Sequence, residues 1–254
     1  MHQRVLDLVA DTPRAAAGRR TLAWIAGGLA AAATVTGGLV APADQLQGQA
    51  QRLMYLHVPA AWVAYAAFAV VLLGSGAYLL LNRDLRFDRL ARSAAEIGVV
   101  LTAVTIATGA VWGHLVWGTW WAWDPRLVSS ALLLVVYAGY LALRRLLSER
   151  HAAADSADHR VARSVAAVGV AGFLLVPVVH FSVVWWRSLH QQATVLAPQR
   201  PPIDPRMGTA LLLAVAAATA AALCVLLRRL AALERRSAPA VRQATAARTP
   251  VRTG

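Results

Sequence analysis

Six long apolar runs constrain the fold of this 254-residue chain more than any other feature of its sequence. They lie at 21–40, 57–81, 94–116, 127–143, 164–184 and 208–227. Each run is close to the ~20 residues that an α-helix needs to cross the ~30 Å hydrocarbon core of a bilayer. The runs are continuous rather than alternating, which excludes a membrane β-barrel. The sequence therefore predicts an all-α integral membrane protein with six transmembrane helices.

The distribution of positive charge predicts the orientation of these helices. The net charge is +13, and all 25 basic residues are arginine. Twenty of them lie in the N-terminus, in the loops at 82–93 and 144–163, and in the C-terminal tail. Because loops rich in arginine stay on the cytoplasmic side, we expect both termini to be cytoplasmic and the connection between the third and fourth helices to face outward. A nucleic-acid-binding protein would instead gather these charges on one soluble module, which this sequence lacks.

The chain divides into one membrane domain and two short basic segments. We expect residues 1–20 to form a cytoplasmic lead and 21–227 the six-helix membrane domain. We expect 228–254 to form a disordered, Arg-rich cytoplasmic tail, because it has too little apolar content to fold alone. The first apolar run is longer than the core of a secretory signal peptide, so we expect it to be retained as a helix. Cys224 is the only cysteine, which excludes an intramolecular disulfide.

The connection between the third and fourth predicted helices, residues 112–126, is rich in tryptophan. It contains Trp117, Trp120, Trp121 and Trp123, followed by Asp124, Pro125 and Arg126. Tryptophan at a membrane boundary often serves only as an anchor. Four indoles in seven positions, followed by a carboxylate and a guanidinium, instead favour a flat aromatic surface with a polar edge that suits a large planar ligand.

Local structure within this connection can also be predicted. The residues spaced as on one face of a helix are Trp117, Trp120, Trp121 and Asp124, and they indicate a short interfacial helix. Asp124 followed by proline is typical of a helix N-cap with proline at the first helical position, so we expect the fourth helix to begin there.

Two histidines are expected at the same outer boundary. His57 lies at the start of the second predicted helix, and His190 follows the fifth. Imidazoles on different helices can approach one iron from opposite faces, and histidine is a common axial ligand of haem. We therefore predict that His57 and His190 ligate the iron of haem (iron protoporphyrin IX), with Arg126 binding a propionate. A single histidine at a membrane boundary more often makes structural hydrogen bonds, so the prediction depends on the two rings converging.

These outer residues resemble a known family. Trp117–Arg126 resembles the WWD signature of membrane haem-handling proteins, and further matching stretches are Met54–Ala61, Trp185–Gln191 and Ile203–Pro205. In this order they are similar to the CcmC family of cytochrome c maturation system I, within the WWD-domain superfamily. The resemblance implies that His57 and His190 are axial haem ligands. It also implies that the signature residues bind haem, namely Trp117, Trp120, Trp121, Trp123, Asp124 and Arg126.

The resemblance further implies a function and partners. It implies a multi-pass protein of the cytoplasmic membrane that binds haem at the outer face and delivers it to a periplasmic haem chaperone similar to CcmE. The implied partners also include the ATP-binding-cassette subunits CcmA and CcmB, the small membrane protein CcmD, and membrane lipid. The sequence departs from the family pattern at Pro125, Ser130 and Val184, where relatives usually carry alanine, glutamate and an acidic residue. Whether the protein is also an enzyme that promotes covalent haem attachment is left open by the sequence.

Other functions stay open at this stage. A transmembrane haem transporter or export subunit would need polar or ligating side chains at mid-membrane depth, where they are costly, and the helices offer few of them. A component of a system II-like cytochrome c synthase would share the Trp-Asp-Pro sequence, although such proteins have more helices and histidines. A structural subunit anchored by its tryptophans would bind no haem.

Overall fold

The computed structural model describes residues 12–81, 83–150, 157–190 and 203–247. The described part of the chain is built from helices, with one isolated bridge between Asp44 and Gly48. The helices are α2 (Pro13–Val35), α3 (Met54–Leu80), α4 (Leu85–Trp117), α5 (Pro125–Arg150), α6 (Ala157–Gly172), α7 (Leu175–Trp185) and α8 (Pro205–Ala247). A π-helical turn η1 (Thr36–Val40) and a 3₁₀ turn η2 (Gln49–Leu53) connect α2 to α3.

Six helical segments of the described chain are long and apolar enough to cross a membrane. They are Pro13–Val40, Gln49–Leu80, Leu85–Trp117, Pro125–Glu149, His159–Trp185 and Pro205–Leu233. These segments coincide with the six apolar runs, so the prediction of six membrane-spanning segments is confirmed. The chain is a multi-pass membrane protein.

The fifth membrane segment is not one continuous helix. It consists of α6 and α7, separated by a turn at Phe173 and Leu174. Pro177 lies four residues after Phe173, and a proline ring clashes with the carbonyl four positions earlier and offers it no N–H. The carbonyl of Phe173 instead accepts a tighter hydrogen bond from the N–H of Val176, at 2.9 Å. The break therefore follows from a proline inside an otherwise helical apolar run.

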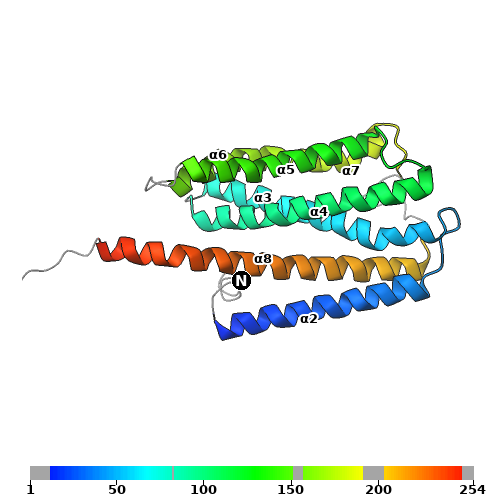
Figure 1. Cartoon of the computed structure of the whole chain (residues 1–254), viewed down its shortest axis with the longest axis horizontal. Coiled ribbons are helices and arrows are strands. Elements are labelled where there is room, and N and C mark those ends of the chain that lie inside the picture. Colours follow the sequence, from blue (N-terminus) through cyan, green and yellow to red (C-terminus); the bar gives the residue numbers. More distant parts are fainter. Residues whose placement is uncertain (1–11, 82, 151–156, 191–202, 248–254) are drawn as a thin grey trace, which may run out of the picture.

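The helices run side by side along the long axis of the molecule (Figure 1). α2 packs mainly against α8, and α8 in turn contacts α3 and α4. The core lies within α3, α4, α5, α6 and α7, where Phe68 stacks on Tyr137 with 3.8 Å between ring centroids. Gly98 permits this packing, because a Cβ there would lie 2.4 Å from the ring of Phe68. The result is a bundle with a closely packed core in α3 to α7 and with its connecting loops at the two ends.

A buried ion pair joins α4 to α5 near one end of the bundle. Nη1 of Arg144 donates to Oδ2 of Asp88 at 2.8 Å, and Nη2 donates both to Oδ1 of Asp88 and to the hydroxyl of Tyr140. The side chains of Arg144 and Asp88 are only 9% and 10% exposed. Asp88 lies near the start of α4 and Arg144 near the end of α5, so this pair sits away from the connection between those two helices.

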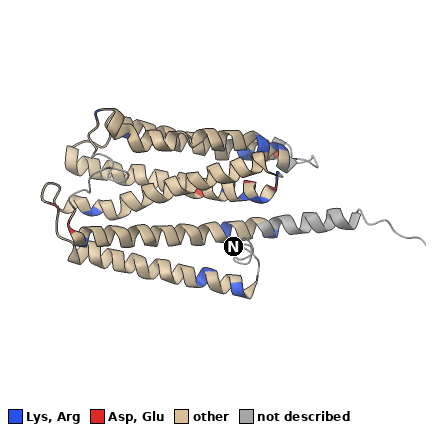
Figure 2. Cartoon of the chain, turned by 180° about the vertical axis from the view of Figure 1, so that it is seen from behind, with Lys and Arg blue, Asp and Glu red and all other residues tan. Residues whose placement is uncertain are grey.

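Most of the arginines drawn in Figure 2 lie toward that same end of the bundle, away from the α4–α5 connection. α8 continues as a helix to Ala247, so the predicted tail is helical over residues 228–247. Residues 1–11 of the predicted lead and residues 248–254 of the tail lie outside the described residues. The orientation of the bundle in the membrane, with this basic end in the cytoplasm, stays a prediction.

Candidate functional site

The α4–α5 connection ends one helix and begins another within seven residues. Gly118 ends α4 in the left-handed conformation, with φ at 74°, and its N–H donates to the carbonyl of His114 at 3.1 Å. Glycine adopts this conformation without the steric cost that a Cβ would bring. Residues 118–124 are not helical. The short interfacial helix predicted from the tryptophan spacing is therefore wrong, because the left-handed glycine interrupts the helical path.

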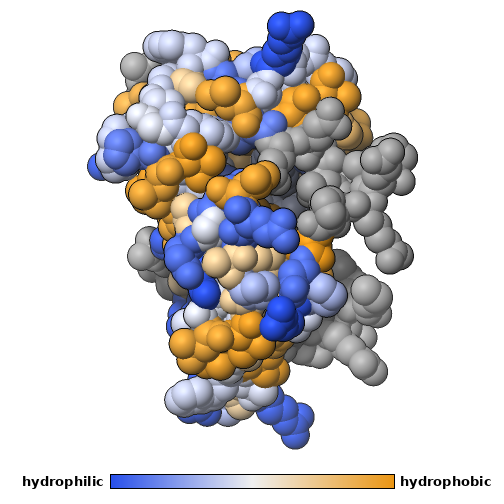
Figure 3. All heavy atoms as spheres, turned by 90° about the vertical axis from the view of Figure 1, so that its right-hand side faces the viewer, coloured by the Kyte–Doolittle hydropathy of each residue, from blue (hydrophilic) through white to orange (hydrophobic). Residues whose placement is uncertain are grey.

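The four indoles of the connection consequently do not share one helical face. Trp117, Trp120 and Trp123 are 37%, 57% and 86% exposed, whereas Trp121 is half-buried. Trp121 and Trp123 meet edge to face, with 5.9 Å between their ring centroids. Trp120 stacks flat on His114 at 4.1 Å. Figure 3 views this end of the molecule, where hydrophobic patches alternate with hydrophilic ones.

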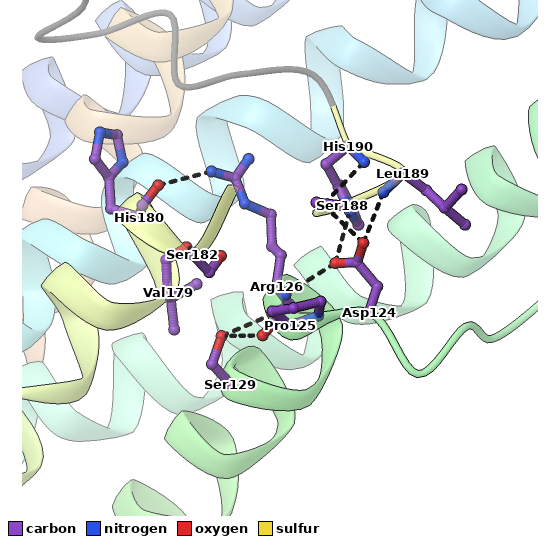
Figure 4. A network of polar contacts seen from close by, with 10 residues as sticks. All are labelled: Asp124, Pro125, Arg126, Ser129, Val179, His180, Ser182, Ser188, Leu189 and His190. Atoms are coloured by element: carbon purple, nitrogen blue, oxygen red, sulfur yellow. Dashed lines mark hydrogen bonds and ion pairs between the residues drawn. The ribbon is translucent and has the colours of Figure 1, made fainter. Parts of the chain in front are cut away.

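Asp124 is the centre of a buried network that joins this connection to the segment after α7 (Figure 4). The residue is only 5% exposed. Its Oδ1 accepts from the N–H of Arg126 at 2.9 Å and pairs with Nδ1 of His190 at 3.2 Å. Its Oδ2 accepts from the hydroxyl of Ser188 at 2.7 Å and from the N–H of Leu189 at 2.8 Å. The predicted N-cap is confirmed, and the same carboxylate also holds His190.

The charges in this network define the state of His190. Burial raises the pKa of Asp124, but the hydrogen bonds from Ser188, Leu189 and Arg126 outweigh it and hold the pKa below its usual value. Burial lowers the pKa of His190, and the adjacent Asp124 offsets this only in part. An ionised carboxylate thus faces a neutral imidazole at pH 7. Since a carboxylate can only accept, Nδ1 of His190 carries the hydrogen and Nε2 keeps its lone pair.

His57 lies in the first turns of α3 and faces α4. Its Nδ1 lies 3.2 Å from Oγ1 of Thr108, and its ring meets Trp112 edge to face at 5.6 Å. Trp112 in turn donates from Nε1 to the side-chain oxygen of Gln47 at 2.8 Å. A Cβ on Gly109 would lie 2.9 Å from Cε1 of His57, so the ring occupies space that only glycine leaves free.

Arg126, in the first turn of α5, joins this helix to α7. The ring of His190 also meets Trp117 edge to face at 4.9 Å. Nη2 of Arg126 donates to the carbonyl of His180 at 2.9 Å (Figure 4). Its Nε is buried and has no hydrogen-bond partner among the described residues. The structure thus gathers most of the predicted site residues at one end of the bundle.

Other residues near the site were not predicted to contribute. Thr108 and Gly109 carry no motif that would reveal them, because each acts on a residue far away in the sequence. Ser188 lies within the matching stretch Trp185–Gln191 but was given no role of its own. Trp112 lies inside the predicted segment but was given no role. His180 packs against three aromatic rings, those of Trp62, Tyr65 and Phe181, and so serves the packing around the site.

Comparison with known sequences identifies the family. A sequence model of the heme exporter protein C family, CcmC, matches residues 12–243, which is nearly the whole chain. The chain belongs to the CcmC family. The WWD residues and both site histidines fall within the matched region.

Individual relatives of this CcmC chain come from bacteria and from a plant. It is 34% identical over 194 residues to heme exporter protein C of Bradyrhizobium diazoefficiens, covering 76% of this chain and 70% of the relative. It is 40% identical over 171 residues to heme exporter protein C of Escherichia coli, covering 66% of this chain and 63% of that relative. A ccmC-like mitochondrial protein of cytochrome c biosynthesis from Marchantia polymorpha is 36% identical over 157 residues, covering 61% and 62%. The chain thus spans roughly two thirds of the length of these relatives.

Proposed function

We propose that this protein binds haem at the outer face of the cytoplasmic membrane and delivers it to a periplasmic haem chaperone similar to CcmE. In this proposal His57 and His190 are the two axial ligands of the iron. The observation that carries it is the way both rings are held. Every hydrogen bond to either imidazole among the described residues uses Nδ1, which leaves both Nε2 atoms for a metal.

The surroundings of the two histidines fit a porphyrin. The exposed rings of Trp117 and Trp120 offer apolar contact to a large macrocycle. The unpartnered Nε of Arg126 is a buried donor that a propionate would satisfy, and arginine binds carboxylates strongly. Asp124 supports His190 in the manner of the carboxylates that orient metal-bound histidines. Trp121, Trp123 and residues 186–190 after α7 complete the proposed site.

The distribution of arginine supports an outward-facing site. The basic end of the bundle lies opposite the α4–α5 connection, and positively charged ends stay in the cytoplasm (Figure 2). Haem bound at the connection would then lie at the outer surface of the membrane, in contact with lipid and within reach of a periplasmic acceptor. Trp185 and Trp186 are more than half exposed at this end and add to the surface available for that acceptor. We expect CcmA, CcmB and CcmD as the further partners of the membrane complex.

Transport of haem through the bundle is the less favoured alternative. A cavity of about 790 Å³ lies between α2, α3, α4 and α8. Its wall consists largely of alanine and glycine, and no histidine is among its described lining residues. A route for haem iron would need ligating groups along it. A system II-like synthase is also less favoured, since the family match is to CcmC.

Absorption spectra of the purified protein test the ligand assignment. We expect the wild type loaded with haem to show the Soret and visible bands of bis-histidine haem, and His57→Ala or His190→Ala to lose them or to bind haem more weakly. His159→Ala is the control, because His159 bonds Tyr78 on α3 and belongs to the basic end of the bundle. A wild type that takes up no haem, or two site variants with unchanged spectra, would refute the proposal.

Delivery is tested by mixing the haem-loaded wild type with a purified, haem-free periplasmic chaperone domain. We expect the haem spectrum to move to the chaperone fraction after separation. Arg126→Gln should retain haem less well than the wild type, because it removes the donor proposed for the propionate. Delivery would be excluded if all haem stayed with the membrane protein.

A further inference from the structure

Thr108 on α4 is placed to decide which nitrogen of His57 carries a hydrogen. Its Oγ1 donates to the carbonyl of Val104 at 2.8 Å, one helical turn earlier. A hydroxyl has a single hydrogen to donate, but its oxygen can also accept. With that hydrogen directed at the Val104 carbonyl, the contact of 3.2 Å to Nδ1 of His57 requires the imidazole to be the donor.

The backbone of the same helical turn offers a second acceptor for the Thr108 hydrogen. Oγ1 of Thr108 also lies 3.2 Å from the carbonyl of Thr105. Because a carbonyl can only accept, the hydroxyl hydrogen points at the backbone of α4 with either partner, and the oxygen is left to accept from His57.

We propose that Thr108 is a positioning residue for His57. Its hydroxyl oxygen accepts the Nδ1 hydrogen and thereby keeps the lone pair of His57 on Nε2, where it is available to iron. The inference rests on the proposed haem-binding function. It assigns to a neutral hydroxyl on α4 the task that Asp124 performs for His190, since both partners fix a ring by accepting from Nδ1.

The tautomer can be measured without haem. The full chain with ¹⁵N-labelled histidine, haem-free in detergent micelles, gives ring nitrogen chemical shifts that distinguish protonated from unprotonated Nδ1. We expect the wild type and Thr108→Ser to hold the hydrogen on Nδ1 of His57, and Thr108→Val to lose that preference. A wild type protonated on Nε2 overturns the proposal, and so does a valine variant that keeps the wild-type tautomer.

A suitable control removes a comparable hydroxyl elsewhere. Thr219 on α8 donates to the carbonyl of Val215 at 2.7 Å, in the same way that Thr108 donates to that of Val104, but it has no hydrogen bond to an imidazole in the described part of the chain. Thr219→Val should leave the tautomer of His57 unchanged. If it shifts the tautomer as Thr108→Val does, the effect is general and the assignment to Thr108 falls. If Thr108→Val fails to fold, the tautomer of the wild type alone decides the question.

Haem titration supplies the second measurement. Loss of a group that orients a metal-bound histidine typically weakens metal binding by about 10- to 100-fold, and we expect that change in Thr108→Val. Thr108→Ser and Thr219→Val should titrate as the wild type does. Equal affinity in Thr108→Val overturns the proposal. A wild type with the expected tautomer that binds no haem instead refutes the haem-binding function, while the hydrogen-bond assignment stands.

Discussion

Replacing Asp124 by asparagine should disrupt the candidate site, although it only exchanges one carboxylate oxygen for an NH₂ group. Each carboxylate oxygen accepts from two donors: Oδ1 from Arg126 and His190, and Oδ2 from Ser188 and Leu189. An amide keeps one oxygen and turns the other into an NH₂ group, which cannot accept. In either orientation of the amide, one backbone N–H then faces another donor.

The expected loss follows from this count. A hydrogen bond to a charged group contributes roughly 1.5–3 kcal/mol, so the loss of two such bonds destabilises the fold by ~3–6 kcal/mol before any relaxation. If the amide places NH₂ beside His190, the imidazole must accept through Nδ1 and its hydrogen moves to Nε2. That tautomer has no lone pair for iron, so haem affinity should fall by about 10- to 100-fold.

Asp204 provides a matched control. It also precedes a proline and caps a helix, since it accepts from the N–H of Arg206 at 2.8 Å at the start of α8. Asparagine caps a helix about as well as aspartate, so Asp204→Asn should change little. Chemical unfolding in mixed micelles measures the stability of both variants, and Soret titration measures haem binding. The reasoning is refuted if Asp124→Asn matches Asp204→Asn in both measurements.

Three further predictions concern packing, charge and pH. Gly109→Ala should displace the ring of His57 and weaken haem binding about tenfold. Gly139→Ala should leave haem binding unchanged, because a Cβ at Gly139 would meet no atom within 4 Å. Equal haem affinities of the two variants in a titration would contradict this prediction. Arg144→Met should lower the free energy of unfolding by about 3–5 kcal/mol, because it leaves Asp88 buried without its ion-pair partner. Adding Asp88→Leu should restore part of this loss, as measured by thermal unfolding. Burial lowers the pKa of His190 from 6.5, so the unfolded chain takes up a proton at a higher pH than the folded chain does. The free energy of unfolding of the wild type should therefore decrease below about pH 6.5 relative to that of His190→Gln. Parallel pH profiles of the two proteins would oppose this prediction.

The sequence was sufficient to predict the membrane-spanning segments, because crossing a bilayer depends on local composition over about 20 residues. The cap at Asp124 was equally local, since proline at the next position favours a helix start. The second role of Asp124 could not be predicted. Its partners Ser188 and Leu189 lie more than 60 residues later, and only the packing of α7 beside α5 brings them together.

Two other features show why the remaining details were missed. The spacing of Trp117, Trp120 and Trp121 satisfied a helical period, but Gly118 adopts a left-handed conformation that ends the helix, and this glycine cap overrode the pattern. Thr108 and Gly109 look like ordinary residues of an apolar helix. Their importance lies in the face they turn toward His57, which no local pattern encodes.

The proline break in the fifth membrane segment has a mechanical consequence. Both helices pack in the core, α6 through Val165 and α7 through Val176 and Val179, and α7 leads into Ser188 and His190. Because the turn at Phe173 interrupts the ladder of backbone hydrogen bonds, α7 can take its own tilt without dragging α6 with it. The joint therefore lets the direction of α7, and with it the placement of Ser188 and His190, differ from the direction of α6 within one membrane segment.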